Sequence, residues 1–476
     1  MKERRYSLVD EVKQGRISRR TFLKRAVAMG FSMSAALAML EACAPKATPT
    51  APPAPTATPA AKATEAPTPI PEPTKIGGAI TATYMSSATY DAAAKELVPA
   101  FEEKHGTKVT IAAFPWMTLV KNNTMDLLTG AGLYDVQSGS VNANLWAYYE
   151  PLDPYIKRDN WKMPYVPGLE DKVAHMEGQT LGVPYAADSY GMAIRADLFE
   201  EAGIDIPTTE TWTWDQFDEA IAELHARNSG QGISGFVLAG GAVDQNGPFF
   251  WGRYDGYHFA KDAVMKHDPD KAIAAFNRLK GQLAYCPDNV MGLSIDEANA
   301  VFLQGKACVL DCWPSFIRAA LKDPDQSQVM GKWAFMPYPV PGFSYLSAWD
   351  ILISKFSKNK DAAWEWIKFY VNPENDKELF FKKYGIGPTM VTTYDDSALL
   401  AEHPNDFPAT KANLARAKTP VVTDEAEWFL DEVVNEVLNG IIGPEEGAQK
   451  VNDGFAGMQG TRPEYELAIA QDLVEK

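Results

Sequence analysis

The chain has 476 residues, which is too long for one ordinary domain and long enough for two sizeable cores. Its composition is 46% hydrophobic and 11% aromatic, as expected of a folded globular protein. The formal net charge of −17 argues against a nucleic-acid-binding protein, because phosphates require a basic surface.

The first 42 residues have the pattern of a twin-arginine export signal. The run SRRTFLK at 18–24 contains Arg19 and Arg20 and matches S-R-R-x-F-L-K at every fixed position. Residues 26–40 supply an apolar stretch of 15 residues, whereas a membrane-spanning helix needs ~20. We therefore predict that residues 1–42 are a signal peptide and that the protein is exported.

The apolar stretch ends in LEAC at 40–43, which resembles a lipobox in which Cys43 is lipidated. Glu41 departs from the small or apolar residue of that motif, and cleavage beside an incidental cysteine is the alternative. Residues 43–75 are rich in Pro, Ala and Thr, a composition that cannot bury a core and predicts a disordered linker. We expect the body to be lipid-anchored at the outer face of the cytoplasmic membrane or in the periplasm.

From residue 79 the pattern alternates between strand and helix. Residues 79–84 and 108–113 predict two strands, with an amphipathic helix between them that stops near Gly106. A helix around 119–128 and a short strand ending at Val136 follow. A strand, a helix and a second strand within about 35 residues favour a parallel sheet and an α/β fold.

Three further helices are predicted in the rest of the chain. Thr213 can cap the first, with Gln216 as its reciprocal partner three residues later. Residues 361–370 have apolar positions on one face, and a third helix runs from Phe429 to a stop at Gly440.

Catalytic and metal-binding motifs are absent or lack their required context. GQGISG at 230–235 fits G-x-G-x-x-G, but a helix precedes it and a strand follows, so we interpret it as a turn. The six histidines have no metal-ligand spacing. We predict a protein that is not an enzyme and has no cofactor and no metal site, with a glycosidase-like carboxylate pair as the alternative that the many acidic residues leave open. Two alternatives remain for Cys286, Cys308 and Cys312, namely one disulfide or three buried thiols.

A series of segments matches, in order, the motifs of one family. They are LGVPY at 181–185, ADLFEEAG at 196–203, TWDQF at 213–217, FLQGKA at 302–307 with Trp313 after it, LISK at 352–355 with AAW at 362–364, and GPT at 387–389. From about residue 76 onward, the chain resembles the family 1 extracellular solute-binding proteins of ABC importers, the group that contains the maltose-binding proteins. Arg195, Ala196 and Cys308 depart from the usual residues of the family.

The resemblance implies an α/β, two-lobe, periplasmic-binding-protein-like fold of type II, whose lobes are joined by a three-crossover hinge. By analogy, the first lobe holds residues 76–186 and 311–348, and the second holds residues 187–310 and 349–476. It also implies a ligand cleft between the lobes and a monomer that delivers its ligand to an ABC permease.

A sugar has flat C–H faces that aromatic rings can cover and hydroxyl groups that carboxylates, amides and hydroxyls can bind. Four tryptophans in loop-like or crossover segments are candidates, with core packing as the alternative: Trp116, Trp251, Trp313 and Trp349. Polar candidates follow predicted strands or lie at crossovers, where α/β sheets bind ligands: Ser86, Ser87, Ser138, Ser140, Asp188, Ser189 and Asp350.

The predicted function is capture of a mono- or oligosaccharide between two lobes that close on it. The alternatives are an exported enzyme that acts on polysaccharides, a surface adhesion or scaffold lipoprotein, and a binding protein for a peptide, a polyamine or a polyol. A strongly anionic ligand is not expected, because few Arg or Lys residues occur in the candidate loops.

Overall fold

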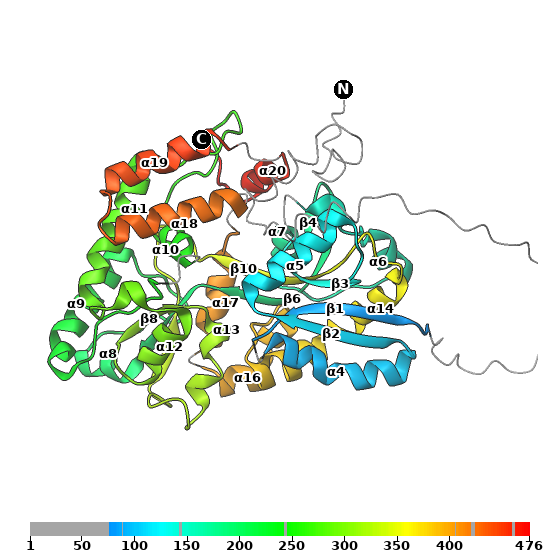
Figure 1. Cartoon of the computed structure of the whole chain (residues 1–476). Helices are drawn as coiled ribbons and strands as arrows, with labels where there is room; N and C mark the ends of the chain where they lie inside the picture. Colours follow the sequence, from blue (N-terminus) through cyan, green and yellow to red (C-terminus); the bar gives the residue numbers. More distant parts are fainter. Residues whose placement is uncertain are drawn as a thin grey trace, which may run out of the picture.

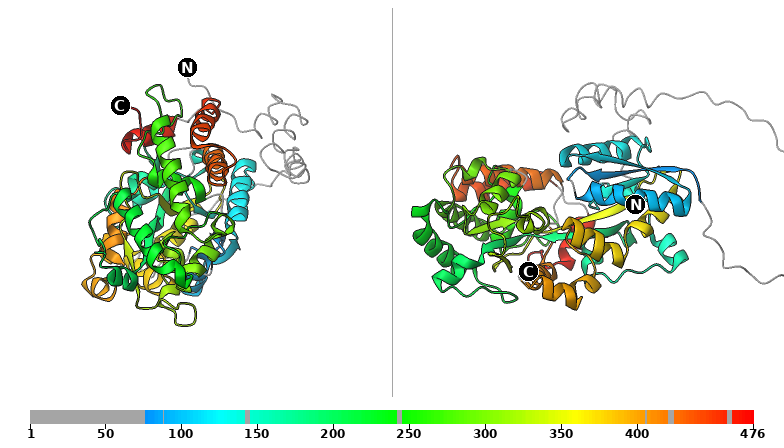
Figure 2. Two further views of the ribbon diagram at one scale, coloured as in Figure 1. Left: turned by 90° about the vertical axis from the view of Figure 1, so that its left-hand side faces the viewer. Right: turned by 90° about the horizontal axis from the view of Figure 1, so that it is seen from below.

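The fold is described from a computed structural model. It describes residues 76–87, 89–141, 145–241, 245–404, 406–419, 424–458 and 462–476, so the predicted signal peptide, Cys43 and the linker lie outside the described residues. Figures 1 and 2 show two α/β lobes side by side. No helix in these ranges combines the length and the apolar character that crossing a bilayer requires.

Lobe one, residues 76–189 and 346–419, is built on a five-stranded sheet. Its strand order is β2 (Lys108–Phe114), β1 (Ala79–Met85), β3 (Val136–Gly139), β10 (Leu346–Ile353) and β6 (Gly182–Ser189). β1 is parallel to β2 and β3, whereas β10 is antiparallel to β3 and β6. The predicted parallel sheet is therefore correct for its first three strands.

Helices cover both faces of the lobe-one sheet. α4 (Tyr90–His105) and α5 (Trp116–Thr129) are the crossovers between the parallel strands, and they lie on opposite faces in Figure 1. α14 (Lys360–Tyr370) buries Trp366 and Ile367 against α4 and β1, which is the face that its apolar spacing predicts.

Lobe two, residues 190–345 and 424–476, has a smaller antiparallel sheet. Its strand order is β8 (Val309–Cys312), β7 (Gly191–Arg195) and β9 (Trp333–Met336). α9 (Trp214–Asn228) begins with the predicted capping box of Thr213 and Gln216 and buries Phe217, Ile221 and Leu224.

Helices from distant parts of the chain complete lobe two. α10 (Asn246–Arg253) and α11 (Pro269–Gln282) pack against α18 (Asp424–Leu438) and α19 (Pro444–Ala456). Figure 1 shows α18 in orange and α19 in red next to the green α11. The C-terminal end of the chain stays on this lobe, because the backbone N–H groups of His258 and Phe259 donate to the Leu473 carbonyl.

The structure corrects the predicted lobe boundaries. Residues 311–345 were expected in the first lobe, but β8 and β9 pair with β7 and therefore belong to lobe two. Conversely, β10 and α14 were expected in the second lobe and belong to lobe one. The apolar pattern shows that a segment is a strand, whereas only backbone pairing shows which sheet it joins.

Most predicted elements are confirmed, with one consequential difference in β3. The strand was expected to end at Val136, but it begins there and runs to Gly139. Ser138 is consequently a strand residue and does not lie in the loop after the strand.

Candidate functional site

The edge of the lobe-one sheet that faces lobe two gathers side chains from three strand ends. Because β1, β2 and β3 are parallel, their carboxyl ends lie at one edge, which points toward lobe two in Figure 1. Ser86 follows β1 and is exposed, Trp116 starts the helix after β2, and Ser140 follows β3. The Ser140 hydroxyl donates to the carbonyl of Ala348 at 3.0 Å, which fixes this edge to β10.

An aromatic group lies at the same edge. The Trp349 ring centroid is 5.2 Å from that of Trp116 and 5.0 Å from that of Tyr90. Trp349 is almost buried, while Trp116 is 40% exposed and presents a large apolar surface to solvent. The group can therefore stack on the apolar face of a ligand without rearrangement of the core.

Asp188 connects the two lobes. It lies near the end of β6 in lobe one, and its Oδ2 atom accepts a hydrogen bond of 2.8 Å from the Ser315 amide of lobe two. Burial raises the pKa of Asp188 to about 6, although the positive charge of Arg318 and the amide hydrogen bonds oppose this rise. At neutral pH the side chain is a carboxylate at the junction between the lobes.

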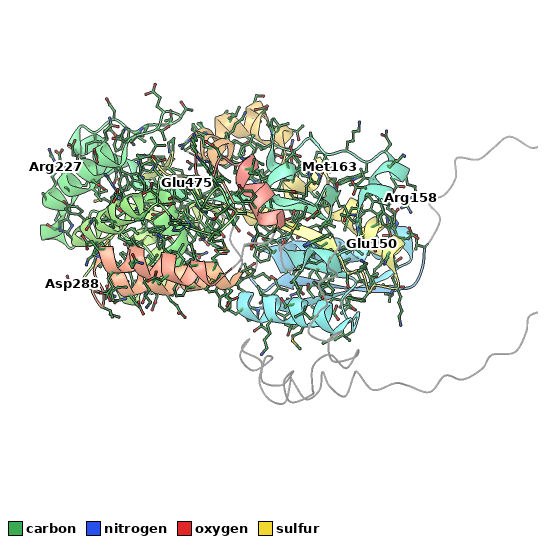
Figure 3. All side chains as sticks on the ribbon, turned by 90° about the horizontal axis from the view of Figure 1, so that it is seen from above. Glu150, Arg158, Met163, Arg227, Asp288 and Glu475 are labelled. Atoms are coloured by element: carbon green, nitrogen blue, oxygen red, sulfur yellow. The ribbon has the colours of Figure 1, made fainter. Side chains whose placement is uncertain are left out.

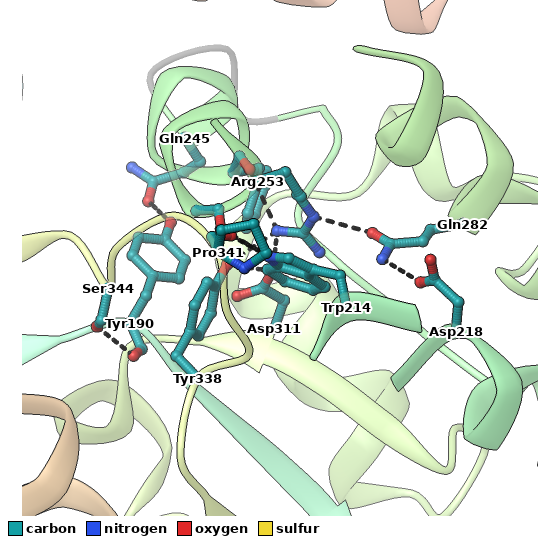
Figure 4. Close-up of polar contacts among 12 residues, drawn as sticks. Tyr190, Trp214, Asp218, Gln245, Arg253, Gln282, Asp311, Tyr338, Pro341 and Ser344 are labelled. Atoms are coloured by element: carbon teal, nitrogen blue, oxygen red, sulfur yellow. Dashed lines mark hydrogen bonds and ion pairs between the residues drawn. The ribbon is translucent and has the colours of Figure 1, made fainter. Parts of the chain in front are cut away.

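The lobe-two wall of the junction consists of aromatic rings fixed by one amide. The Tyr190 and Trp313 ring centroids are 4.2 Å apart, and Tyr345 packs against Trp313 at 5.6 Å. The Gln245 Oε1 atom accepts hydrogen bonds from the Tyr190 hydroxyl at 2.5 Å and from the Trp313 indole at 2.8 Å. Figure 4 shows Gln245 next to Tyr190 at this wall.

We call these residues together the interlobe site. It comprises Ser86, Tyr90, Trp116, Ser140, Asp188, Tyr190, Gln245, Trp313 and Trp349. Of the predicted residues, Ser86, Trp116, Ser140, Asp188, Trp313 and Trp349 are brought together here. The same edge of lobe one and the first crossover supply most of them, as the strand-end argument predicts.

Five predicted residues do not fit direct contact with a ligand. Trp251 is fully buried in the lobe-two core, and Ser138 is fully buried with its hydroxyl bonded to that of Tyr185. Asp350 has no exposed surface. The Ser87 hydroxyl accepts the Tyr90 amide at the start of α4, and Ser189 is a buried residue paired within the sheet. Trp251, Ser138, Ser87 and Ser189 serve packing or local structure in this conformation.

Tyr90, Tyr190 and Gln245 of the interlobe site were missed by the sequence predictions, and so was Trp428, an exposed tryptophan of lobe two outside that site. Trp428 is 52% exposed on α18, and its neighbour Glu427 accepts a hydrogen bond from the Tyr345 hydroxyl at 3.0 Å. Its signal in the sequence is a tryptophan outside the apolar stripe of its helix, where core packing does not require it. Gln245 precedes α10 and has no comparable sequence signal.

The described part of the chain holds no group of three or more His, Cys, Asp or Glu side chains that could bind a metal ion. Cys286, Cys308 and Cys312 are buried free thiols, which is the second of the two predicted alternatives. Figure 3 shows charged side chains such as Arg158 and Arg227 at the two outer ends of the molecule, away from the interlobe site.

Two α/β lobes with aromatic and polar side chains at their junction define a solute-binding protein. The family model of the bacterial extracellular solute-binding proteins matches residues 85–377, and the chain belongs to this family. It is a family of binding proteins and not of enzymes, as the sequence predicts.

Relatives with known names share part of this chain. A mannitol-binding protein from Pseudomonas aeruginosa is 28% identical over 289 residues, which are 56% of this chain and 63% of the relative. The chain therefore matches less than two thirds of that relative's length.

Solved structures share the fold over most of the chain. A solute-binding protein from Agrobacterium radiobacter in complex with ribitol has a TM-score of 0.67 at 21% identity, and covers 81% of this chain and 100% of its own. A maltose-bound MalE3 protein from T. maritima has a TM-score of 0.68 at 22% identity, and covers 80% of this chain and 100% of its own. The predicted two-lobe α/β fold is thus confirmed at the level of architecture.

Proposed function

We propose that the chain is the lipid-anchored solute-binding protein of an ABC importer and that it binds a sugar or a polyol between its lobes. The supporting observations are one aromatic pair in each lobe, Trp116 with Trp349 in lobe one and Tyr190 with Trp313 in lobe two. Rings from both lobes suit the C–H faces of a polyhydroxy ligand, and Asp188 supplies a carboxylate for its hydroxyl groups.

The ligands of similar proteins support this ligand class. A relative is named for mannitol, and similar structures hold ribitol and maltose. Polyols were an alternative ligand class in the sequence analysis, and the proposed ligand class therefore includes both sugars and polyols.

Binding is proposed to act by closure of the lobes. The chain passes between the lobes at Tyr190 and along 337–345, and it lies in lobe two again from α18, which gives the three crossovers of the proposed hinge. A ligand that touches both walls stabilises the closed form, because only that form offers both sets of contacts. No covalent bond changes.

Calorimetry tests the ligand proposal. The full chain is titrated with D-mannitol, ribitol and maltose, and at least one is expected to bind. Trp116→Ala is expected to weaken that binding at least about tenfold, because the exposed ring supplies stacking. Met117→Ala, which changes an exposed side chain on the neighbouring position, is the matched control and should bind as the wild type does. Absence of heat with all three ligands contradicts the proposal.

Closure and anchoring have separate tests. Small-angle scattering should show a smaller radius of gyration with the bound ligand, and superimposable curves at saturation contradict closure.

For the anchor, Cys43→Ala should release the protein from the membrane fraction and abolish incorporation of labelled palmitate. Retention of both labelling and membrane association in this variant argues against lipidation at Cys43.

A further inference from the structure

A small pocket lies in lobe two beside Trp313. Its lining includes Tyr190, Gln245, Asn299 and Asp311, and its volume is about 10 Å³. A volume of this size holds one oxygen-sized group. Because Tyr190 and Trp313 line both this pocket and the interlobe site, the pocket extends the lobe-two wall inward.

Asp311 has one oxygen atom that no described residue satisfies. Its Oδ2 atom accepts hydrogen bonds of 2.9 Å from the Arg253 guanidinium and of 2.9 Å from the Tyr338 hydroxyl. Its Oδ1 atom is fully buried and has no hydrogen-bond partner within the described ranges. An unsatisfied buried carboxylate oxygen is costly, so a ligand donor that reaches this atom gains a strong charge-assisted hydrogen bond.

The surroundings hold Asp311 rigidly. Arg253 has no exposed side-chain surface and stacks on the Trp214 ring at 4.1 Å, as Figure 4 shows. Its Nε atom also donates to Gln282 at 2.9 Å. The pocket therefore has a fixed hydrogen-bond acceptor, placed before any ligand arrives.

The amide of Gln245 complements this acceptor. Because Tyr190 and Trp313 both donate to its Oε1 atom, its NH₂ group is the part left to interact with a ligand. A hydroxyl group can donate to Asp311 and accept from an amide at the same time. A carboxylate or a phosphate cannot donate to Asp311 and would add a like charge beside it.

We propose that this pocket binds a terminal hydroxymethyl group of the ligand, through Asp311 Oδ1 with Gln245 and Asn299. It thereby selects sugars or polyols with a free primary hydroxyl over their terminally deoxygenated, oxidised or phosphorylated counterparts. This inference rests on the proposed function and adds which end of the ligand lobe two reads.

Two comparisons by calorimetry on the full chain test it. The first uses wild-type protein and compares D-mannitol, ribitol and maltose with counterparts in which every terminal CH₂OH is a methyl group. Loss of a hydrogen bond to a charged acceptor should weaken binding at least about tenfold. The second uses Asn299→Leu, which keeps the branched shape of a buried side chain and removes its polar atoms. Asp296→Asn, on the exposed side of the same helix, is the control.

The proposal predicts a specific coupling between ligand and variant. Asn299→Leu should weaken binding of the hydroxylated ligand and reduce its advantage over the methyl counterpart, whereas Asp296→Asn should change neither. Equal affinity of wild type for both ligands overturns the inference and leaves the proposed function intact. Should Asn299→Leu fail to fold, the wild-type comparison decides alone. If none of the three parent ligands binds, the proposed function falls and the inference falls with it.

Discussion

The buried ion pair between Arg318 and Asp406 offers a quantitative test of the contact between the lobes. Arg318, in the lobe-two part of the chain, donates to both carboxylate oxygens of Asp406 in lobe one at 2.6 and 3.3 Å, and to the Gly385 carbonyl at 2.9 Å. Both charged side chains are at most 2% exposed. Burial alone would lower the pKa of Arg318, but the Asp406 carboxylate raises it above the ordinary value, so the guanidinium stays charged.

Asp406→Leu should therefore lower the free energy of unfolding by about 3–5 kcal/mol, because it leaves a buried cation without its partner. The charge of Asp188 compensates only in part, since Asp188 bonds to other groups. Arg318→Met combined with Asp406→Leu removes both charges and should recover most of the loss. Glu223→Gln, which breaks an exposed pair with Arg227, is the control and should cost less than about 1 kcal/mol.

Urea unfolding followed by circular dichroism measures these differences. A loss of unfolding free energy below about 1 kcal/mol for Asp406→Leu would refute the reasoning, since a buried guanidinium without its partner destabilises the folded state by more than that. A double variant no more stable than Asp406→Leu would show that packing of the side chains, and not their charge, holds this contact.

Three further predictions concern stability. Burial lowers the pKa of His267 to about 3 from 6.5, so the unfolded chain takes up a proton that the folded chain does not as pH falls below 6.5. His267→Phe removes this penalty. Its gain in the free energy of unfolding over wild type, measured by urea unfolding, should be about 2 kcal/mol larger at pH 5 than at pH 7.5. A gain that does not change with pH would contradict the lowered pKa of His267. Thr213→Ala should lower the free energy of unfolding by about 1 kcal/mol, because the α9 cap is lost, and Thr213→Ser should stay close to wild type in the same assay. An alanine variant as stable as wild type would refute the role of the cap. Gly387→Ala would place a methyl group 2.2 Å from the Ala187 carbonyl oxygen and should lower the melting temperature. Gly281→Ala, whose methyl group meets nothing within 4 Å, is the control and should not lower it. Equal melting temperatures of the two variants would show that the backbone at Gly387 shifts at no cost.

Local features of the fold were predictable because their causes are local. The capping box at Thr213 and the apolar stripe of residues 361–370 each lie within one helix, and the structure confirms both. The assignment of 311–345 to the first lobe failed for the opposite reason. Which sheet a strand joins depends on pairing between distant residues, as in β7 with β9, and the spacing of apolar residues within a strand is the same in either case.

The candidate site likewise contains residues that the sequence predicts and residues that it misjudges or misses. Strand ends predicted Ser86 and Ser140, because the edge of a parallel sheet follows from strand direction. Trp251 was misjudged because Gly247 and Pro248 suggest a loop, whereas the structure has both in the first turn of α10, where proline is well tolerated. Trp428 was missed since a helical tryptophan suggests core packing until its exposure is known.

The position of β10 has a consequence for how the molecule folds as the chain leaves the ribosome. β10 pairs with β6 in lobe one, yet the whole first part of lobe two, residues 190–345, separates them along the chain. The sheet of lobe one therefore lacks a central strand until that long insertion has been made. Such distant pairing slows folding and leaves the edges of β3 and β6 open to wrong partners. A chain that emerges slowly gives the first part of lobe two, residues 190–345, time to collapse before β10 is made, and that collapse brings β10 toward its place between β3 and β6.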